Sequence, residues 1–528
     1  MSSICGLSDD LLVAILSLVK TKDAVATSLL SKRWLTLWKL VPRLDYIITP
    51  WYASHSGSDF IDNFLLLSEA PVLETMHLRL GYNCKPEEQE RWVDIALARH
   101  VRVLELIYSR SPSTPMPFPR SLFTYNGLVV LRLQEVVIRD IPSTIFLQSL
   151  KTLSLLCVRF CSRDDELVHT LLSACPVLET LVVRRWLEDY VTTFKIAVPS
   201  LQSLYIMRRP GGHAQTDDRE YIINAPSLKD LKVCDEFSWF RPLVEMPKLV
   251  KAEIKIRRDD SKKLLGCIAS AKHLSLCVTS AKQLLMEKSV ENLCQLEYLE
   301  LCTNCSSDWL CLLLKHSPKL RVLRFNNPDL KVCDEFSWFR PLVEMPKLVK
   351  AEIKIRRDDS KKLLGCIASA KHLSLCVTSA KQLLMEKSVE NLCQLEYLEL
   401  CTNCSSDWLC LLLKHSPKLR VLRFNNPTSQ IDGCNSLRRI RDRWEEPCCV
   451  PECLVTSLET VEWIGYEGTE TEKEVANYIL EKACHLKKMT IFRHITNLRK
   501  KYRTLIDLVS RLSCSIKCRL EVVPLEQH

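Results

Sequence analysis

The eight residues PVLETLVV (176–183) recur with variations along most of the chain. Their common form is Pro-x-Leu-x-x-Leu-x-aliphatic, in which apolar residues alternate with polar ones after a proline. Clear copies begin at Pro71, Pro199, Pro226 and Pro318. Weaker copies centre on 104–106, 131–133, 153–155, 274–276 and 299–301. Successive copies lie about 21 to 28 residues apart, so the chain is built from many similar short units.

That period is typical of leucine-rich repeats. The alternation predicts a short parallel strand in each unit, and segments such as 165–175 predict a helical return between strands. One unit cannot bury its leucines alone, so neighbouring units must stack. We therefore predict an α/β leucine-rich-repeat solenoid. The alternative is an ordinary buried mixture of strands and helices, which regular recurrence over ten units disfavours.

A much longer repeat lies within this array, because residues 230–328 recur without a difference as residues 329–427. Complete identity over 99 residues indicates either a recent duplication or an error in the gene model. The boundary between the copies breaks the short period, because the strand pattern at 323–325 is followed by another at 330–332, only seven residues later. We predict strain at this junction, because a full coil does not fit between them.

The N-terminal segment 7–45 carries more apolar side chains than some 40 residues can bury among themselves. Ser8, Thr21 and Ser31 stand at positions that suit helix N-caps, which predicts three short helices. The surplus of apolar surface indicates a docking site. Trp34 and Trp38, four residues apart on one helix face, either dock the partner or pack on the repeats that follow.

Composition excludes several other functions. Glycine accounts for 11 of 528 residues, and neither phosphate-binding glycine motif occurs. No catalytic constellation can be assembled, so we expect no enzyme activity and no cofactor. The 26 cysteines are read as reduced residues, and Cys302-x-x-Cys305, copied as Cys401-x-x-Cys404, is not read as a metal site. The net charge of +10 is spread thinly, and no targeting or membrane segment is apparent, so neither nucleic acid nor a membrane is an expected partner.

Residues 7–45 resemble an F-box, closest to the form found in plant F-box proteins. The match runs almost throughout 22–38 (KDAVATSLLSKRWLTLW), whereas Ser8 and Lys20 replace prolines common in the family. The resemblance implies that this segment docks on a Skp-type subunit. The residues expected to make that contact are Leu7, Leu11, Leu12, Ile15, Leu16, Val25, Leu29, Trp34, Leu37 and Trp38.

Residues 450–491 resemble the FBD domain, which follows F-box and leucine-rich repeats in a plant family. Trp444, the sequence VPECL (450–454), Gly465-Tyr466 and a helix at 472–483 carry this resemblance. We therefore expect a three-helix F-box at 1–48, leucine-rich repeats at 49–427 and a small α+β FBD domain at 428–528.

The resemblance implies a substrate-recognition adaptor of an SCF-type cullin-RING ubiquitin ligase, with a Skp-type subunit, a cullin and an unidentified target protein as partners. Such a chain works in the cytoplasm, the nucleus or both. The alternative is a leucine-rich-repeat scaffold that binds RNA or a small ligand and whose F-box no longer docks. Candidate target-binding residues on the strands are His77, Arg79, Arg132, Tyr205 and Lys232.

Overall fold

The computed structural model of the chain describes residues 4–47, 56–81, 84–108, 116–161, 166–185, 191–208, 219–235, 238–256, 258–259, 264, 266–278, 293–301, 313–327, 345–355, 367–377, 392–401, 406–425, 444, 446–493 and 518–524. The chain forms two compact units. Unit 1 spans Met1–Ile268 and unit 2 spans Ala269–His528.

Unit 1 is built on a ladder of parallel strands, each paired with the next repeat along the chain. Each strand alternates buried and partly exposed residues, and the buried ones are the leucines and other apolar residues of the repeat pattern, such as Leu104, Leu131 and Leu181. The strands, in ladder order, are β1 (Arg43–Ile47), β2 (Thr75–Leu80), β3 (Val103–Tyr108), β5 (Val130–Gln134), β7 (Thr152–Phe160), β8 (Thr180–Arg185), β10 (Ser203–Arg208), β12 (Asp230–Cys234) and β14 (Lys251–Ile256). The predicted α/β solenoid is confirmed.

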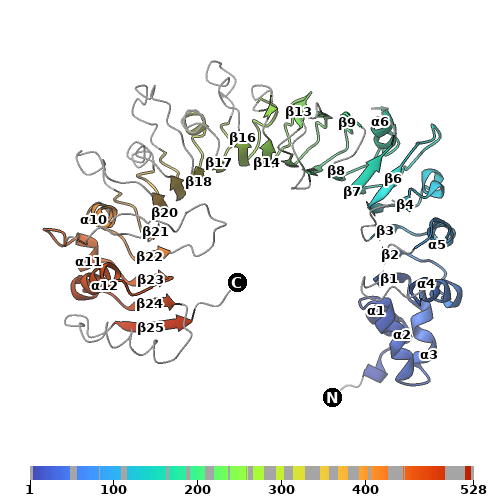
Figure 1. Ribbon diagram of the computed structural model, residues 1–528, viewed down its shortest axis with the longest axis horizontal. Helices are drawn as coiled ribbons and strands as arrows, with labels where there is room; N and C mark the ends of the chain where they lie inside the picture. The colour runs from blue at the N-terminus through green and yellow to red at the C-terminus, as the bar shows by residue number, and fades with distance from the viewer. Residues whose placement is uncertain are drawn as a thin grey trace. The chain divides into compact units, whose positions relative to one another are not determined.

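The returns between ladder strands are of two kinds. Helices α4 (Ser56–Leu67), α5 (Pro86–Ala98) and α6 (Glu166–Ser173) follow the predicted form, and α4 and α5 lie on the same side of β1, β2 and β3 (Figure 1). After β8 the returns are strands instead, and they form a second parallel sheet of β9 (Thr193–Ala197), β11 (Glu220–Asn224), β13 (Trp239–Pro242) and β15 (Arg258–Asp259), while β4 (Met116–Pro117) and β6 (Val136–Ile138) pair beside β7. The prediction of helical returns is therefore wrong for these repeats. In β9, for example, the buried Phe194 and Ile196 alternate with Thr193 and Lys195, a pattern that favours a strand.

Unit 2 is a second ladder of the same kind. Its strands are β16 (His273–Val278), β17 (Tyr298–Leu301), β18 (Val322–Asn327), β19 (Lys350–Ile355), β20 (His372–Val377), β21 (Tyr397–Cys401), β22 (Val421–Asn425), β23 (Thr460–Ile464), β24 (Lys488–Arg493) and β25 (Arg519–Pro524). Helices α10 (Ser406–Lys414), α11 (Glu452–Thr456) and α12 (Glu470–Lys482) lie together beside β22, β23 and β24 (Figure 1). The FBD-like segment thus contributes three strands to the same ladder as the repeats before it.

The two identical 99-residue copies meet in register in this ladder. Strand β18 pairs directly with β19, so that Leu323 lies opposite Ala351, and both side chains are fully buried. In the first copy the strand equivalent to β19 is β14, which pairs with β12 through Leu231 and Ala252. The same strand sequence therefore accepts two different neighbours. The strand pattern at 330–332, where strain was predicted, lies outside the described residues.

Removal of residues 329–427 is expected to leave a stable protein. Residues 318–328 and 417–427 have the same sequence, so β18 would take the place of β22 against β23 with no new side-chain contact. We expect the thermal unfolding midpoint of the shortened chain to equal or exceed that of the full chain, because β18 then presents to β23 the same side chains that β22 presents in the full chain. Calorimetry measures this directly. A fall of several degrees would show that the second copy adds stability of its own.

Candidate functional site

The three N-terminal helices form one compact bundle, and polar side chains hold the beginning of its first helix. Ser8 caps α1 (Asp9–Leu16), since its hydroxyl accepts a hydrogen bond from the Leu11 amide at 3.4 Å. An ion pair of 2.7 Å between Arg33 and Asp9 holds the start of α1 near α3 (Trp34–Leu37). The prediction of three helices is confirmed.

The two other predicted caps are wrong. Thr21 is the first residue of α2 (Thr21–Ala26), and its hydroxyl instead accepts a hydrogen bond of 2.7 Å from the Asp45 amide in β1. Ser31 lies before the start of α3, where Arg33 occupies the cap position without a side-chain hydrogen bond. Thr21 therefore links the helices to the first ladder strand.

The ten residues expected to contact a Skp-type subunit fall into two groups. Leu11, Ile15 and Leu29 are exposed, at 53%, 38% and 89%, and Leu7 and Val25 are half-buried. The other five have at most 8% of their surface exposed and form the core of the bundle: Leu12, Leu16, Trp34, Leu37 and Trp38. In the free chain, therefore, only the residues of the first group are accessible to a Skp-type subunit.

Further exposed apolar residues in the same segment were not predicted as contacts. The largest exposures are those of Leu18 and Leu30, at 81% and 68%. Ile4, Val19, Leu35 and Leu40 are also exposed. The apolar surplus indicated that such residues exist, but which side of a short helix stays exposed depends on packing against the following repeat. An apolar surface of this kind is typical of a protein-protein contact.

The bundle shares its core with the first repeat. The Trp38 ring lies 5.8 Å from the Phe64 ring of α4, centroid to centroid, and the Lys39 carbonyl accepts hydrogen bonds from the amides of Glu69 and Ala70. The alternative that Trp38 packs on the repeats is thus confirmed. Because these contacts lie within unit 1, the N-terminal helices and the first repeats are joined by packed side chains and not by a free linker.

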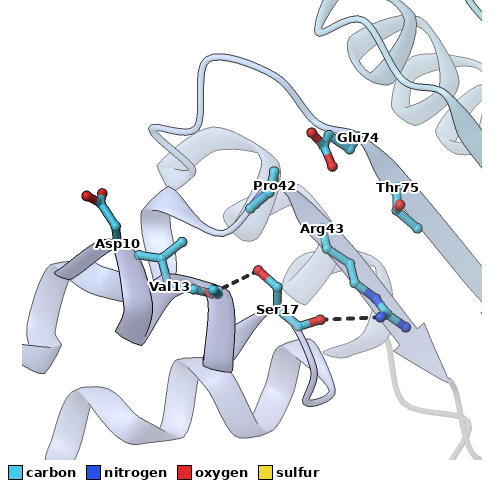
Figure 2. A pocket seen from close by; sticks show the side chains of 8 residues that line it. Asp10, Val13, Ser17, Pro42, Arg43, Glu74 and Thr75 are labelled. Atoms are coloured by element: carbon cyan, nitrogen blue, oxygen red, sulfur yellow. Dashed lines mark hydrogen bonds between the residues drawn. The ribbon is translucent and has the colours of Figure 1, made fainter. Parts of the chain in front are cut away.

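A pocket lies at this junction, between α1 and the first two ladder strands. The Arg43 guanidinium crosses it, donating a hydrogen bond of 3.3 Å to the Ser17 carbonyl, while the Ser17 hydroxyl donates to the Val13 carbonyl (Figure 2). Arg43 also pairs with Asp45 at 2.9 Å. The residues that line the pocket are Asp10, Val13, Ala14, Ser17, Pro42, Arg43, Glu74 and Thr75. We regard the pocket as part of the structural joint, since Arg43 already binds groups on both sides.

The ladder of unit 1 presents an open face, defined as the side of the strands opposite the buried leucines. All five candidate target-binding residues lie on it. His77 and Arg79 belong to β2, and Arg132, Tyr205 and Lys232 stand on β5, β10 and β12. Their registers place His77, Arg132, Tyr205 and Lys232 in one row across the strands, with Arg79 in the adjacent row.

Three of the candidates are engaged by neighbouring side chains of the open face. Arg132 pairs with Glu105 at 3.2 Å, Lys232 pairs with Glu253 at 2.8 Å, and the Tyr205 hydroxyl donates to Asp230 at 2.8 Å. Arg79 has no such partner among the residues that the structure describes. The sequence pattern located these side chains on the face but could not distinguish paired from unpaired ones.

His77 is the titratable candidate. Burial lowers its pKa from the ordinary value of 6.5, and Arg43 and Arg132 act in the same direction, while Glu105 and Asp45 oppose them. Its Nε2 atom is buried and finds no hydrogen-bond partner among the described residues. The surroundings of His77 therefore favour the neutral imidazole over the charged one.

The stability of the chain should depend on His77 below neutral pH. Because its folded-state pKa lies below the unfolded one, the unfolded state binds the proton more readily, and stability is lost as the pH falls through the unfolded value near 6.5. Urea unfolding measured at pH 7.5 and at pH 5.5 gives the free energy of unfolding at each pH. Between these two pH values, that free energy should fall less for His77→Gln than for the wild type. An identical loss in both proteins would show that His77 does not contribute to this pH dependence.

The FBD-like segment is also ordered around a small set of interactions. Thr469 caps α12 and Glu472 completes a capping box by accepting from the Thr469 amide at 2.9 Å. Gly465 has φ 72°, which favours glycine at this turn after β23. The predicted helix at 472–483 corresponds to α12, and Tyr466 is buried beside Trp463.

No group of ligating side chains that could hold a metal ion occurs within the described ranges. Of the two Cys-x-x-Cys pairs, only Cys401 lies in the part of the chain that the structure describes. Over the same residues, no helix is long and apolar enough to cross a membrane.

Comparison with known families matches all three parts of the chain. The F-box domain matches residues 4–46, the leucine-rich repeats of FBD-associated F-box protein At5g56370 match residues 89–246, and the FBD matches residues 445–491. Together with the ladder and the N-terminal bundle, these matches define an F-box protein with leucine-rich repeats.

Relatives from Arabidopsis thaliana match over nearly the whole chain. An FBD-associated F-box protein, At5g56440, is 39% identical over 536 residues, covering 98% of this chain and 99% of the relative. FBD-associated F-box protein At5g56370 is 31% identical, with the same coverage, and F-box/FBD/LRR-repeat protein At5g56420 is 31% identical, covering 97% of each chain. The chain belongs to this family of F-box/FBD/LRR-repeat proteins.

Proposed function

We propose that the chain is the substrate-recognition adaptor of an SCF-type cullin-RING ubiquitin ligase. In this proposal the F-box binds a Skp-type subunit, which connects it to the cullin, and the leucine-rich repeats bind the target protein. The observation that carries the proposal is the apolar surface of the F-box, where Leu11, Ile15 and Leu29 remain exposed although the bundle already has a complete core. Such exposure is costly unless a partner covers it.

The adaptor contributes proximity and no covalent step. It holds target lysines near the E2 enzyme, which raises their effective concentration at the reacting thioester. The shared core of the F-box and the first repeat supports this role, since Trp38 packs on Phe64 and the Thr21 hydroxyl accepts from the Asp45 amide. A joint without a free linker keeps the start of the repeats at a fixed distance from the ligase.

The alternative function is a binding scaffold for RNA or a small ligand whose F-box no longer docks. The two proposals are separated by affinity purification of the tagged chain from plant cells treated with a proteasome inhibitor. Recovery of a Skp-type subunit and a cullin supports the adaptor, and proximity labelling in the same cells identifies candidate targets. Recovery of neither subunit would favour the scaffold.

A further inference from the structure

We propose that the open face of unit 1 binds an extended acidic peptide whose two carboxylates, six residues apart, contact Arg79 and Arg184. Aliphatic side chains between the two acids would cover the apolar residues that lie between these arginines. The inference rests on the proposed function, because such a peptide would be the recognised segment of the target.

The charges of this face favour an anionic ligand. Each carboxylate on it already has a partner: Asp45 pairs with Arg43, Glu105 with Arg132 and Glu253 with Lys232, and Asp230 accepts from Tyr205. The cations are more numerous. Among the described residues, Arg79, Arg184 and Lys251 have no ion-pair or hydrogen-bond partner for their side chains. A ligand therefore meets unpaired cations and no unpaired carboxylate.

Arg79 and Arg184 stand in the same register row across the ladder. The row runs from Arg79 in β2 through Ile107, Gln134 and Leu156 to Arg184 in β8. Four strand-to-strand steps separate the two arginines, which corresponds to about 19 Å at about 4.8 Å per step. Ile107 and Leu156 are half-buried, so part of each side chain remains available for contact.

Further aliphatic residues lie in other parts of the open face. Val103 and Val130 face each other across β3 and β5, and Val182 and Met207 lie on β8 and β10. All four are half-buried side chains of the open face. Between the two arginines themselves the row is aliphatic at Ile107 and Leu156 and polar at Gln134, and the two aliphatic positions suit valine, leucine or isoleucine side chains of a peptide.

The spacing sets the length of the ligand. An extended chain rises about 3.3 Å per residue, so about six residues span the distance between the strand positions of Arg79 and Arg184. Side chains at positions 1, 3, 5 and 7 of such a peptide point to the same side. The expected motif is therefore acid-x-aliphatic-x-aliphatic-x-acid, with each carboxylate placed to accept paired hydrogen bonds from a guanidinium.

The described strands of unit 2 do not offer this combination on their equivalent face. Its cations are largely neutralised, since Arg324 and Lys350 both pair with Glu352, Arg423 pairs with Glu462, and Lys488 and Arg519 both pair with Glu521. The face of unit 1 also differs from a surface for single-stranded RNA, which uses aromatic side chains to stack bases. Among its described strand residues the only aromatic ring besides the His77 imidazole is Tyr205, which is bonded to Asp230.

The test uses the full chain in complex with its Skp-type subunit and a fluorescein-labelled peptide with the core Glu-Ser-Val-Ser-Leu-Ser-Glu. Binding is measured by fluorescence polarisation at low salt. Two control peptides accompany it, one in which the second glutamate is moved by one residue to the opposite side of the strand, and one with lysine in place of both glutamates. We expect binding of the first peptide to exceed that of both controls.

Charge reversal of the two arginines should weaken this binding by at least about tenfold, because it places like charges opposite the peptide carboxylates. The variant is Arg79→Glu combined with Arg184→Glu. The matched control is Arg139→Glu combined with Lys248→Glu, which reverses two exposed cations of unit 1 that lie outside the ladder strands. The control should bind the peptide as the wild type does.

Three results would overturn the inference. The first is equal binding of the first peptide and of the peptide with the displaced glutamate. The second is unchanged peptide binding by the variant that carries Arg79→Glu and Arg184→Glu. The third is a single-stranded RNA that binds more tightly than the first peptide and whose binding the same variant abolishes. Retention of the Skp-type subunit is measured on every variant. Absence of peptide binding by the wild-type chain, with the Skp-type subunit bound, contradicts only this inference, whereas failure of the wild-type chain to bind the subunit contradicts the proposed function.

Discussion

A chain carrying Leu11→Asp and Leu29→Asp should lose its affinity for a Skp-type subunit by a factor of about one hundred or more. Both side chains are exposed in the free protein, at 53% and 89%, so a charge there is solvated before binding and must be desolvated on binding. Truncating an interface anchor already costs about 2 kcal/mol or more, and burying an unpaired carboxylate adds to that cost. Isothermal titration calorimetry with the purified subunit measures the change.

The matched control for this variant is Leu66→Asp. Leu66 is 79% exposed and lies on α4, outside the F-box segment. It should leave the affinity unchanged, and all three proteins should unfold at similar temperatures because the substituted side chains are exposed. If the double variant binds as tightly as the control, the exposed face of the F-box is not the docking surface.

Replacing Trp38 with alanine should act on stability first. The ring is 8% exposed and packs on Phe64, so the substitution removes contacts that join the F-box to the first repeat. Large-to-small changes of buried aromatic residues cost about 3 to 5 kcal/mol. We expect the free energy of unfolding of unit 1, measured with urea, to fall by that amount. Any loss of subunit binding should then be explained by the fraction of the protein that is unfolded.

Leu66→Ala provides the comparison, since an exposed leucine should change the free energy of unfolding by no more than about 0.5 kcal/mol. An unchanged unfolding transition in Trp38→Ala, together with lost subunit binding, would mean that Trp38 is a contact residue and not part of the shared core. The two predictions therefore separate docking residues from core residues within one segment.

The repeats could be predicted because their pattern is local. A leucine such as Leu181 or Leu204 occupies the same place in every strand, and alternation with period two determines which side faces the core. The open-face position of Arg132 and Tyr205 follows from the same alternation. The returns were harder to predict, because a segment such as 193–197 becomes a strand only when a neighbouring repeat supplies a strand to pair with it.

The docking surface could be predicted only in part. Composition showed that 7–45 has too many apolar residues, but the burial of Trp34 and Trp38 depends on side chains of other helices and of the next repeat, which lie elsewhere in the sequence. The same limit applies to charge. Arg132 and Arg79 look alike in the sequence, and only the strand register shows that one has a carboxylate opposite it.

The central claim is that the F-box binds a Skp-type subunit, and the most direct test is calorimetric titration of the purified subunit into the full-length wild-type chain. We predict saturable binding with one subunit per chain. The heat capacity change should be negative, because apolar residues such as Leu11, Ile15 and Leu29 become buried. Absence of binding at subunit concentrations of about 100 μM, well above the Kd expected of a stable complex, would contradict the claim.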